Sequence, residues 1–562
     1  MESMREEHQA IWENILYRDK KSWGLAAVFG TGLSTALAFG ENLERYGSLP
    51  LSNRAMWMRI VLVAVVVTVV TVFLWSVLQE FQERRRDAAS RERRRHSLFA
   101  GWDALAPQTR SLLLWLLLML CYFVVLMAVY PGFFVYDAQD ELTMVETRQF
   151  TTHHPLFHVL LLGGVITGVH HLTGSYNLGI FCYSLLQMSV MAASLVTLLD
   201  YLRRKGIRRW IRMVSVLFFG FCPTVVMFVL CTAKDSLFSA FLLLLTVSLL
   251  EMFAEPEMFW QSRRKRILFL LSAAGMMLLR HNGAYAFLVF LLFLIGWSRG
   301  FRRKAAVLWG GAFVLFLAAT MVMTASMRAT SDENQEILTV PIQQLARTFV
   351  YNGEDFSAAD REAMLELMPE EDWKRYTPKL SDPVKVHFNN AAFEEDPGKY
   401  LSLWLRMGVK HPLTYLNAWF LTSYGYWYPN AVIDCYRGNT VFTYTYRDSS
   451  YFGFETELPG ERESRIPWLN ELYRQFSLEK WPQTTPVVHL FFSPAVLFWL
   501  FAFAMLYCID RGCHVPCRAM FPVFLVWLTV LLGPCSLVRY VVILWFAAPL
   551  FLAFLFNAER FR

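Results

Sequence analysis

Residues 203–230 read RRKGIRRWIRMVSVLFFGFCPTVVMFVL, a basic cluster followed by an apolar run that is long enough for a membrane-spanning helix. A hydrocarbon core needs about 20 apolar residues per helix. Short basic clusters alternate with such runs along the 562 residues, of which 18% carry charge and 55% are apolar. A soluble chain carries about 25% charge. The sequence therefore predicts an all-α polytopic membrane protein.

We predict about twelve transmembrane helices, one for each apolar run that meets the length requirement or is enclosed by other helices. The polar first 22 residues lead straight into the first run, which we expect to serve as its own insertion signal. The twelve runs are 23–40, 59–79, 111–130, 176–200, 212–230, 236–253, 267–279, 284–297, 305–324, 489–509, 519–533 and 538–556.

One further apolar stretch, residues 155–172, decides the topology. Short loops rich in Lys and Arg stay in the cytoplasm. If 155–172 spanned the membrane, the basic cluster Arg203–Arg212 would lie outside and every later cluster would be inverted. If it lies flat on the outer surface, all clusters face the cytoplasm, and its three histidines suit an interfacial helix. We therefore predict a cell-membrane protein with a juxtamembrane first outer loop, both termini cytoplasmic and a large outer segment, 325–488. The clusters are Arg84–Arg95, Arg203–Arg212, Arg263–Arg266 and Arg299–Lys304, with Arg511/Arg518 and Arg560/Arg562 later.

This topology divides the chain into four predicted parts. The large outer segment is expected to be a mixed, mostly helical extracytoplasmic domain that sits on the membrane. The net charge of +7 comes from loops between spans, so it predicts contact with membrane lipids and no nucleic-acid partner. The parts are 1–105 (two spans and a basic linker), 106–324 (transmembrane core with outer loop 131–175), 325–488 (extracytoplasmic domain) and 489–562 (three spans).

The nine cysteines do not form the pattern of a disulfide framework, and only Cys435 lies well inside the outer segment. Cys513 and Cys517 flank a histidine, but a second ligand pair for structural zinc is missing. Reduced thiols are the simpler interpretation.

The first outer loop carries the most specific pattern. It reads YPGFFVYDAQDE over residues 130–141 and continues to TTHHPL at 151–156. A carboxylate just beyond a span, then a helix, then His-Pro before a juxtamembrane helix resembles the GT-C superfamily, whose members transfer sugars from polyprenyl-phosphate carriers. The resemblance implies that Asp137, or less directly Asp140, is the catalytic base or a metal ligand. His154-Pro155-Leu156 matches the start of the second juxtamembrane helix of that superfamily, with one proline missing.

The ordered motifs YPG…YD…HHP, TAKD, RHNG and GYWYP also resemble an uncharacterised bacterial family of GT-C-like membrane proteins. The resemblance covers roughly residues 110–556. The two spans before residue 106 are an addition to the usual superfamily core, and their role is left open.

Asp137 also has a physical case of its own. Inverting glycosyl transfer needs a carboxylate to take the proton of the acceptor hydroxyl, while cations stabilise a departing phosphate. The alternative is that Asp137 caps a helix beginning near Ala138, and the two roles are compatible. Asp140 and Glu141 fall on the next turn, where a solvated helix face explains them as well.

Four basic residues at predicted outer helix ends are candidate ligands of the donor phosphate: Lys234, Arg280, Arg347 and Arg539. Each could instead anchor its helix at the interface. Asp235 is expected to cap the helix starting at Ser236, and Asn282 to form a turn with Gly283. His153 and His154 orient Asp137, bind a divalent metal or shape the turn before Pro155; the sequence does not establish a metal.

These features predict an inverting hexosyl- or pentosyltransferase that moves a sugar from a polyprenyl-phosphate donor to a cell-envelope acceptor. Two alternatives stay open: a transporter or flippase for a lipid-linked or small solute, and a non-catalytic envelope-assembly protein. A two-halves transporter would show a repeated hydropathy pattern and polar residues at the midplane, and the sequence shows neither.

Overall fold

The computed structural model describes residues 18–91, 102, 104–330, 334–435, 443–444 and 458–562. The predicted polar start up to residue 17 and the end of the basic cluster Arg84–Arg95 therefore lie outside the described residues. Within the described ranges the ordered elements are helices, and β-pairing is limited to isolated bridges. The all-α prediction is confirmed, whereas the mixed character expected for 325–488 is not found among its described residues.

Among the described residues, eight helices are long and apolar enough to cross a membrane. This supports a multi-pass membrane protein, although the predicted count of about twelve is not confirmed. They are α2 (Lys20–Tyr46), α3 (Arg54–Arg91), α5 (Pro107–Ala128), α7 (Leu156–Thr173), α8 (Tyr176–Arg204), α11 (Lys234–Ala254), α15 (Arg302–Met327) and α27 (Ile543–Asn557) continued by η6 (Ala558–Phe561).

The remaining predicted spans are shorter or broken. The predicted span 212–230 consists of α9 (Arg209–Phe221) and α10 (Pro223–Leu230), bent by 56° at the intervening residue. Pro223 has no amide hydrogen, so the helical hydrogen-bond ladder is interrupted there. The shorter apolar helices are α14 (His281–Trp297), α25 (Pro494–Asp510) and α26 (His514–Val530). The predicted span 267–279 lies in α13 (Arg263–Leu279), a helix of 17 residues that begins with four basic residues.

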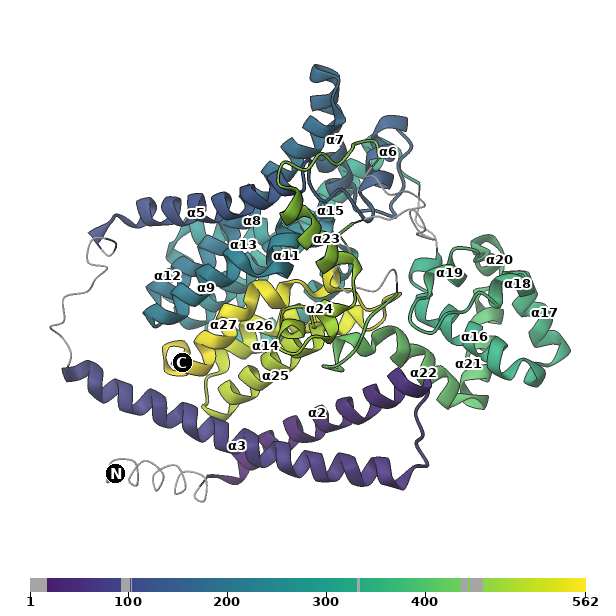
Figure 1. Ribbon diagram of the computed structural model, residues 1–562, viewed down its shortest axis with the longest axis horizontal. Coiled ribbons are helices and arrows are strands. Elements are labelled where there is room, and N and C mark those ends of the chain that lie inside the picture. The colour runs from purple at the N-terminus through teal and green to yellow at the C-terminus, as the bar shows by residue number, and fades with distance from the viewer. Residues whose placement is uncertain (1–17, 92–101, 103, 331–333, 436–442, 445–457) are drawn as a thin grey trace.

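Helix α11 lies at the centre of the helical body. It contacts α8, α13, α26 and α27, and its side chains are buried along most of its length. The amino-terminal hairpin of α2 and α3 packs against α25 at the edge of this body (Figure 1). Most of the apolar side chains of α3 between residues 61 and 74 stay exposed, as expected of a helix that faces lipid.

The segment 325–488 divides between two cores. One part forms a lobe with its own core around Trp373, Leu403 and Met364, visible at one side of Figure 1. We call this part the lobe. It comprises η1 (Asn334–Glu336), α16 (Thr339–Asn352), η2 (Gly353–Asp355), α17 (Ala358–Leu367), α18 (Glu370–Trp373), α19 (Asp382–Lys385), α20 (Asn390–Glu395) and α21 (Pro397–Lys410).

The rest of the segment returns to the helical body. Helix α22 (Pro412–Ser423) and η3 (Tyr424–Tyr426) pack toward α2 and α25, while Tyr473 of α23 (Pro467–Leu478) belongs to the main core. Three short helices complete the chain: α24 (Trp481–Thr484), η4 (Val488–Phe491) and η5 (Val538–Val541). Beyond α27 the chain ends in η6 (Ala558–Phe561), and both η6 and α12 (Pro256–Gln261) lie on the side of the body away from the lobe (Figure 1).

Helix α6 (Ala138–Thr147) and α7 carry the predicted first outer loop and pack on each other and on α8. Gly132, in the turn before α6, has a φ of 143°, and a Cβ there would meet the Ser184 side chain at 2.3 Å. Only glycine fits this close approach, which brings the loop down onto α8.

Candidate functional site

A cavity of about 700 Å³ opens where the helical body meets the lobe. We call it the charged pocket. Its walls come from the loop before α6, the residues before α7, the first turns of α11 and α14, the turn before η5, and the lobe. Every predicted site residue except Arg347 lines it: Asp137, Asp140, His153, His154, Lys234, Asp235, Arg280, Asn282 and Arg539.

Asp137 occupies the N-cap position of α6, but its carboxylate makes no capping hydrogen bond. Instead, Oδ2 accepts a hydrogen bond from Lys234 Nζ at 2.7 Å, and Oδ1 lies 3.4 Å from Arg539. The preceding residue, Tyr136, has a φ of 59°, a conformation that is uncommon for a bulky residue and is found at functional sites. Capping alone therefore does not explain Asp137.

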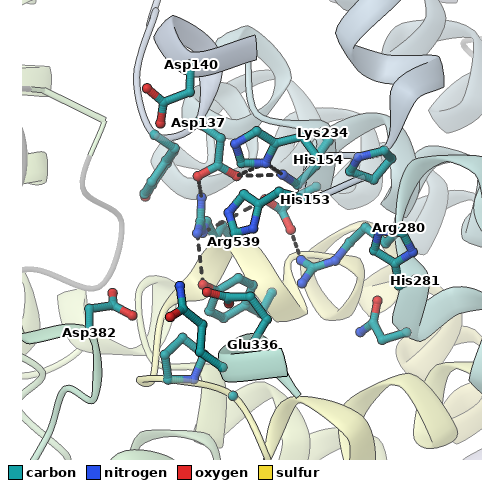
Figure 2. A pocket seen from close by; sticks show the side chains of 18 of the residues that line it. Asp137, Asp140, His153, His154, Lys234, Arg280, His281, Glu336, Asp382 and Arg539 are labelled. Atoms are coloured by element: carbon teal, nitrogen blue, oxygen red, sulfur yellow. Dashed lines mark hydrogen bonds and ion pairs between the residues drawn. The ribbon is translucent and has the colours of Figure 1, made fainter. Parts of the chain in front are cut away.

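Lys234 is the hub of the pocket (Figure 2). Its ammonium contacts Asp137, the Nδ1 atom of His154 at 2.8 Å and Glu141 at 3.6 Å. Burial opposes the charge of Asp137, but Arg539 and Lys234 outweigh burial and hold the pKa of this carboxyl well below its usual value. Burial and Lys234 lower the pKa of His154 to about 3, so its imidazole is neutral at physiological pH.

The position of the Lys234 ammonium helps to decide whether a divalent metal ion can bind in the pocket, a question that the sequence left open. Ligand atoms of Asp137, Glu141 and His154 lie within 4.8 Å of one another, a spacing suitable for a metal ion. However, Lys234 Nζ already contacts all three groups and supplies a positive charge among them. A metal ion at these atoms would have to displace the ammonium, so this trio does not fit a metal in the conformation observed.

Asp235 and Arg280 form a second buried ion pair. The sequence predicted Asp235 as a helix cap, but α11 begins at Lys234 with Ala233 as its N-cap and without a side-chain capping bond. That prediction is wrong, because the Asp235 carboxylate instead contacts the Arg280 guanidinium. Arg280 also lies over the ring of Tyr540, at 4.8 Å from its centroid. The pair joins the first turn of α11 to the start of α14.

Asn282 and Gly283 do not form the predicted turn, because both lie in the first turn of α14. The Asn282 amide donates to Thr529 at 3.0 Å, which ties α14 to α26. A Cβ on Gly283 would meet Phe238 at 2.8 Å, so the glycine permits close packing against α11.

The guanidinium of Arg539 lies between the carboxylates of Asp137 and Asp235. It faces Asp137, lies 4.0 Å from Asp235 and packs over Tyr136 at 4.4 Å from the ring centroid. It also donates to the hydroxyl of Tyr540 at 2.8 Å. Two carboxylates and two aromatic rings thus hold one cation at the floor of the pocket.

Arg347 lies outside the charged pocket. It is buried in α16, donates to the Tyr376 hydroxyl at 2.8 Å and to the Gly47 carbonyl at 2.7 Å, and so joins the lobe to the end of α2. Because these contacts satisfy the guanidinium in a different part of the molecule, we do not assign Arg347 to the site.

Asp140 and His153 lie at the pocket mouth, and both side chains are exposed. Partial desolvation, and then the charge of Asp137, raise the pKa of Asp140. The two carboxylates of one loop therefore differ: Asp137 is held ionised by cations, and Asp140 binds a proton more readily.

Glu141 is buried rather than solvated, which corrects the sequence-based interpretation. Its carboxylate contacts Lys234 and His158, and His158 Nε2 lies 2.8 Å from the Tyr183 hydroxyl. Tyr183 in turn contacts Gln187, whose amide donates to the Cys231 carbonyl at 2.6 Å, three residues before Lys234. This buried chain braces Lys234 from α6, α7 and α8. Its signal in the sequence was the spacing of Glu141, one helical turn after Asp137.

The lobe contributes residues that the sequence analysis missed. Lys385 Nζ contacts Glu336 at 2.7 Å and Asp382 at 3.2 Å, and all three line the pocket. Local sequence carries no signal for them, because only the tertiary fold brings them to the cavity that Asp137 also lines. We call these three residues the lobe wall, and Asp137, Lys234, Asp235, Arg280 and Arg539 the bundle wall.

Fold and site together define a multi-pass α-helical membrane protein with a buried charge network beside a cavity that charged residues line. Residues 144–560, well over half of the chain, match a protein family described as a family of unknown function (DUF6020), and the chain belongs to this family. The matched region contains most of the pocket but begins after Asp137 and Asp140. No curated protein and no solved structure shows a significant match.

Proposed function

We propose that this protein is an inverting glycosyltransferase that moves a sugar from a polyprenyl-phosphate donor to a cell-envelope acceptor on the outer face of the membrane. One observation carries the proposal: the acidic and basic residues of the bundle wall lie together around one cavity. They are three cationic side chains and two carboxylates. A volume of about 700 Å³ lies in the range of small-molecule sites, which is about 300–1,000 Å³.

The proposed topology keeps twelve spans and lays α7 on the outer surface. By length and composition α7 could itself cross the membrane, so the placement depends on the basic clusters. With α7 flat, the clusters face the cytoplasm and the pocket and lobe face outward. The lipid tail of the donor then stays in the bilayer while its phosphate reaches the helix ends at the pocket.

The donor phosphate competes for cations that are already paired. Lys234, Arg280 and Arg539 balance Asp137 and Asp235. A phosphate that binds Lys234 and Arg539 draws them away from Asp137, and the pKa of Asp137 then rises toward its usual value. The same cations stabilise the negative charge of the departing polyprenyl phosphate. Donor binding thereby converts Asp137 from an ion-pair partner into a base.

In the reaction, Asp137 accepts the proton of the acceptor hydroxyl as the oxygen attacks the anomeric carbon. The bond between that carbon and the phosphate oxygen breaks, and the electrons leave with polyprenyl phosphate. His154, neutral and hydrogen-bonded to Lys234, holds the ammonium at the cavity wall, where it can pass from Asp137 to the donor phosphate. The acceptor is placed at the lobe wall, where carboxylates can receive hydrogen bonds from sugar hydroxyls.

The test is incubation of the purified protein with a panel of polyprenyl-phosphate hexoses and pentoses, together with a detergent extract of cell envelope. Release of polyprenyl phosphate that requires the extract, and is lost in Asp137→Asn, is the expected result. Transport of intact donor across a proteoliposome without release would instead support a flippase. Neither release nor transport, with donor binding intact, would support the non-catalytic alternative.

A further inference from the structure

Two thiols, Cys435 and Cys535, meet next to the charged pocket. Cys535 lies in the turn between α26 and η5 and is 1% exposed, whereas Cys435 is half-buried. They are 100 positions apart in the chain, so nothing in the local sequence pairs them. A hydrogen bond with the Cys435 thiol, followed by burial, raises the pKa of Cys535.

The backbone independently places both residues on one short segment, 379–381. The Cys435 thiol donates to the carbonyl of Lys379 at 3.3 Å. The next residue, Leu380, pairs with Cys535 in an antiparallel bridge, and the Ser381 amide donates to the Pro534 carbonyl at 3.0 Å. Both cysteines therefore contact the same short segment, 379–381. Their side chains approach from neighbouring backbone positions, as a disulfide requires.

Both partners are also held in place. Lys379 contacts Asp434 at 3.3 Å, and Ile433 is bound by the Gln483 side chain at 2.8 Å. On the other side, the Tyr426 hydroxyl donates to the Cys535 carbonyl at 3.0 Å. Such contacts reduce the movement that forming a bond would need.

We propose that Cys435 and Cys535 form a disulfide in the mature protein, joining the segment before α23 to the turn that precedes η5, the helix that carries Arg539. The proposal rests on the proposed outward orientation of the pocket, because disulfides persist in oxidising compartments. The oxidant is a protein or small-molecule disulfide. The half-buried Cys435, as thiolate, attacks a sulfur of that disulfide and releases one thiol.

The Cys535 thiolate then attacks Cys435 Sγ and releases the second thiol, so that two cysteine thiols are oxidised and one external disulfide is reduced. The bond would hold Gly533 and Pro534, which line the pocket, against residue 380. Arg539 follows a few residues later, so the disulfide stabilises the position of a bundle-wall cation.

A second group of thiols serves as an internal reference. Cys508, Cys513 and Cys517 lie at the end of α25 and the start of α26, beside the chain terminus, where Arg562 donates to the carbonyl of Arg511. In the proposed topology that end faces the reducing cytoplasm. The pair Cys435 and Cys535 and the group of three thiols therefore face different compartments in the proposed topology, and only the pair is expected to be oxidised.

The test uses the full-length protein, alkylated with N-ethylmaleimide in intact cells before lysis and digested without reductant. Mass spectrometry is expected to find the Cys435 and Cys535 peptides linked, two hydrogens lighter than the sum of the reduced peptides. The peptides of Cys508, Cys513 and Cys517 should be recovered unlinked, with their cysteines alkylated or free. Cys435→Ser should abolish the link, while the matched control Cys182→Ser, a half-buried thiol on α8, should leave it intact.

Adding oxidised glutathione to the purified protein in detergent tests whether the two thiols can pair at all. The labelling in cells tests whether they lie in an oxidising compartment. Linkage in detergent but alkylation of both thiols in cells would overturn the proposed modification and the outward orientation, leaving the geometry correct. Alkylation of both thiols under both conditions would overturn the pairing itself. Neither readout uses glycosyl transfer, so an inactive protein that shows the link would contradict only the proposed function.

Discussion

The two walls of the charged pocket hold their charges differently. In the bundle wall, Asp235 is 1% exposed and Asp137 is 11% exposed at the side chain, and each is paired with an arginine or lysine. In the lobe wall, Glu336 is 29% exposed and contacts Lys385, which also contacts Asp382. Buried, paired charges keep a fixed geometry, whereas partly exposed carboxylates can change partners. The bundle wall is therefore suited to a constant donor phosphate, and the lobe wall to hydroxyl groups of an acceptor.

The strongest test of this contrast is Asp137→Asn. Loss of a general base lowers kcat by about 10²- to 10⁴-fold, while Asp140→Asn should cost less than about 10-fold, since its carboxylate lies at the exposed mouth. The measurement is release of polyprenyl phosphate, with thermal unfolding and polyprenyl-phosphate binding as controls of folding. A larger loss in Asp140→Asn would transfer the role of base to Asp140.

Donor affinity should distinguish Arg280 from Arg347, two residues that the sequence predicted as phosphate ligands. The fold places Arg280 in the pocket and Arg347 outside it. Arg280→Lys keeps the positive charge beside Asp235 but loses the planar fork of the guanidinium. We expect polyprenyl phosphate to bind about 10-fold more weakly. The matched variant Arg347→Lys, outside the pocket, should bind as the wild type does. Equal effects of the two substitutions would remove the bundle wall from donor binding.

The neutral His154 should make stability depend on pH. Its pKa is about 3 in the fold and 6.5 in the unfolded chain, so the unfolded state binds more protons below pH 6.5. Stability is therefore complete above pH 6.5 and is lost progressively as the pH falls toward 3, by about 2 kcal/mol at pH 5.

Thermal unfolding at pH 7.5 and pH 5 measures this dependence. His154→Gln keeps an acceptor for Lys234 without titrating, so the variant should lose less stability between the two pH values. An identical loss in wild type and variant would assign the pH dependence to other groups.

The smallest effect is expected in the lobe wall. Glu336→Gln keeps the hydrogen-bonding atoms but removes the charge, while Lys385 retains Asp382 as partner. We expect the acceptor KM to rise about 3- to 10-fold with donor affinity unchanged, because one hydrogen bond to a charged group is weakened. A change in donor affinity instead would show that both walls bind the phosphate.

The candidate site was largely predictable as a set of residues, but the contacts among them were not. Charged residues at the ends of apolar runs are visible one at a time, which identified Asp137, Lys234, Arg280 and Arg539. The prediction that Asp235 caps a helix was based on local capping preferences and was wrong. In the fold, its carboxylate contacts Arg280 and does not cap the helix terminus. Arg347 looked equivalent to the others along the chain, yet α16 directs it to Tyr376 and Gly47.

Hydropathy along the chain determined the all-α membrane class, the positions of the long apolar helices and the helix start after Pro155, because apolar length and proline geometry act locally. The tertiary structure alone decided which charges meet: Asp137 with Lys234 and Arg539, Asp235 with Arg280, the buried Glu141 with His158, and the lobe residues across the cavity. Ion pairs depend on distances of a few ångströms between residues that are separated by tens to hundreds of positions. Those distances exist only after the helices have packed.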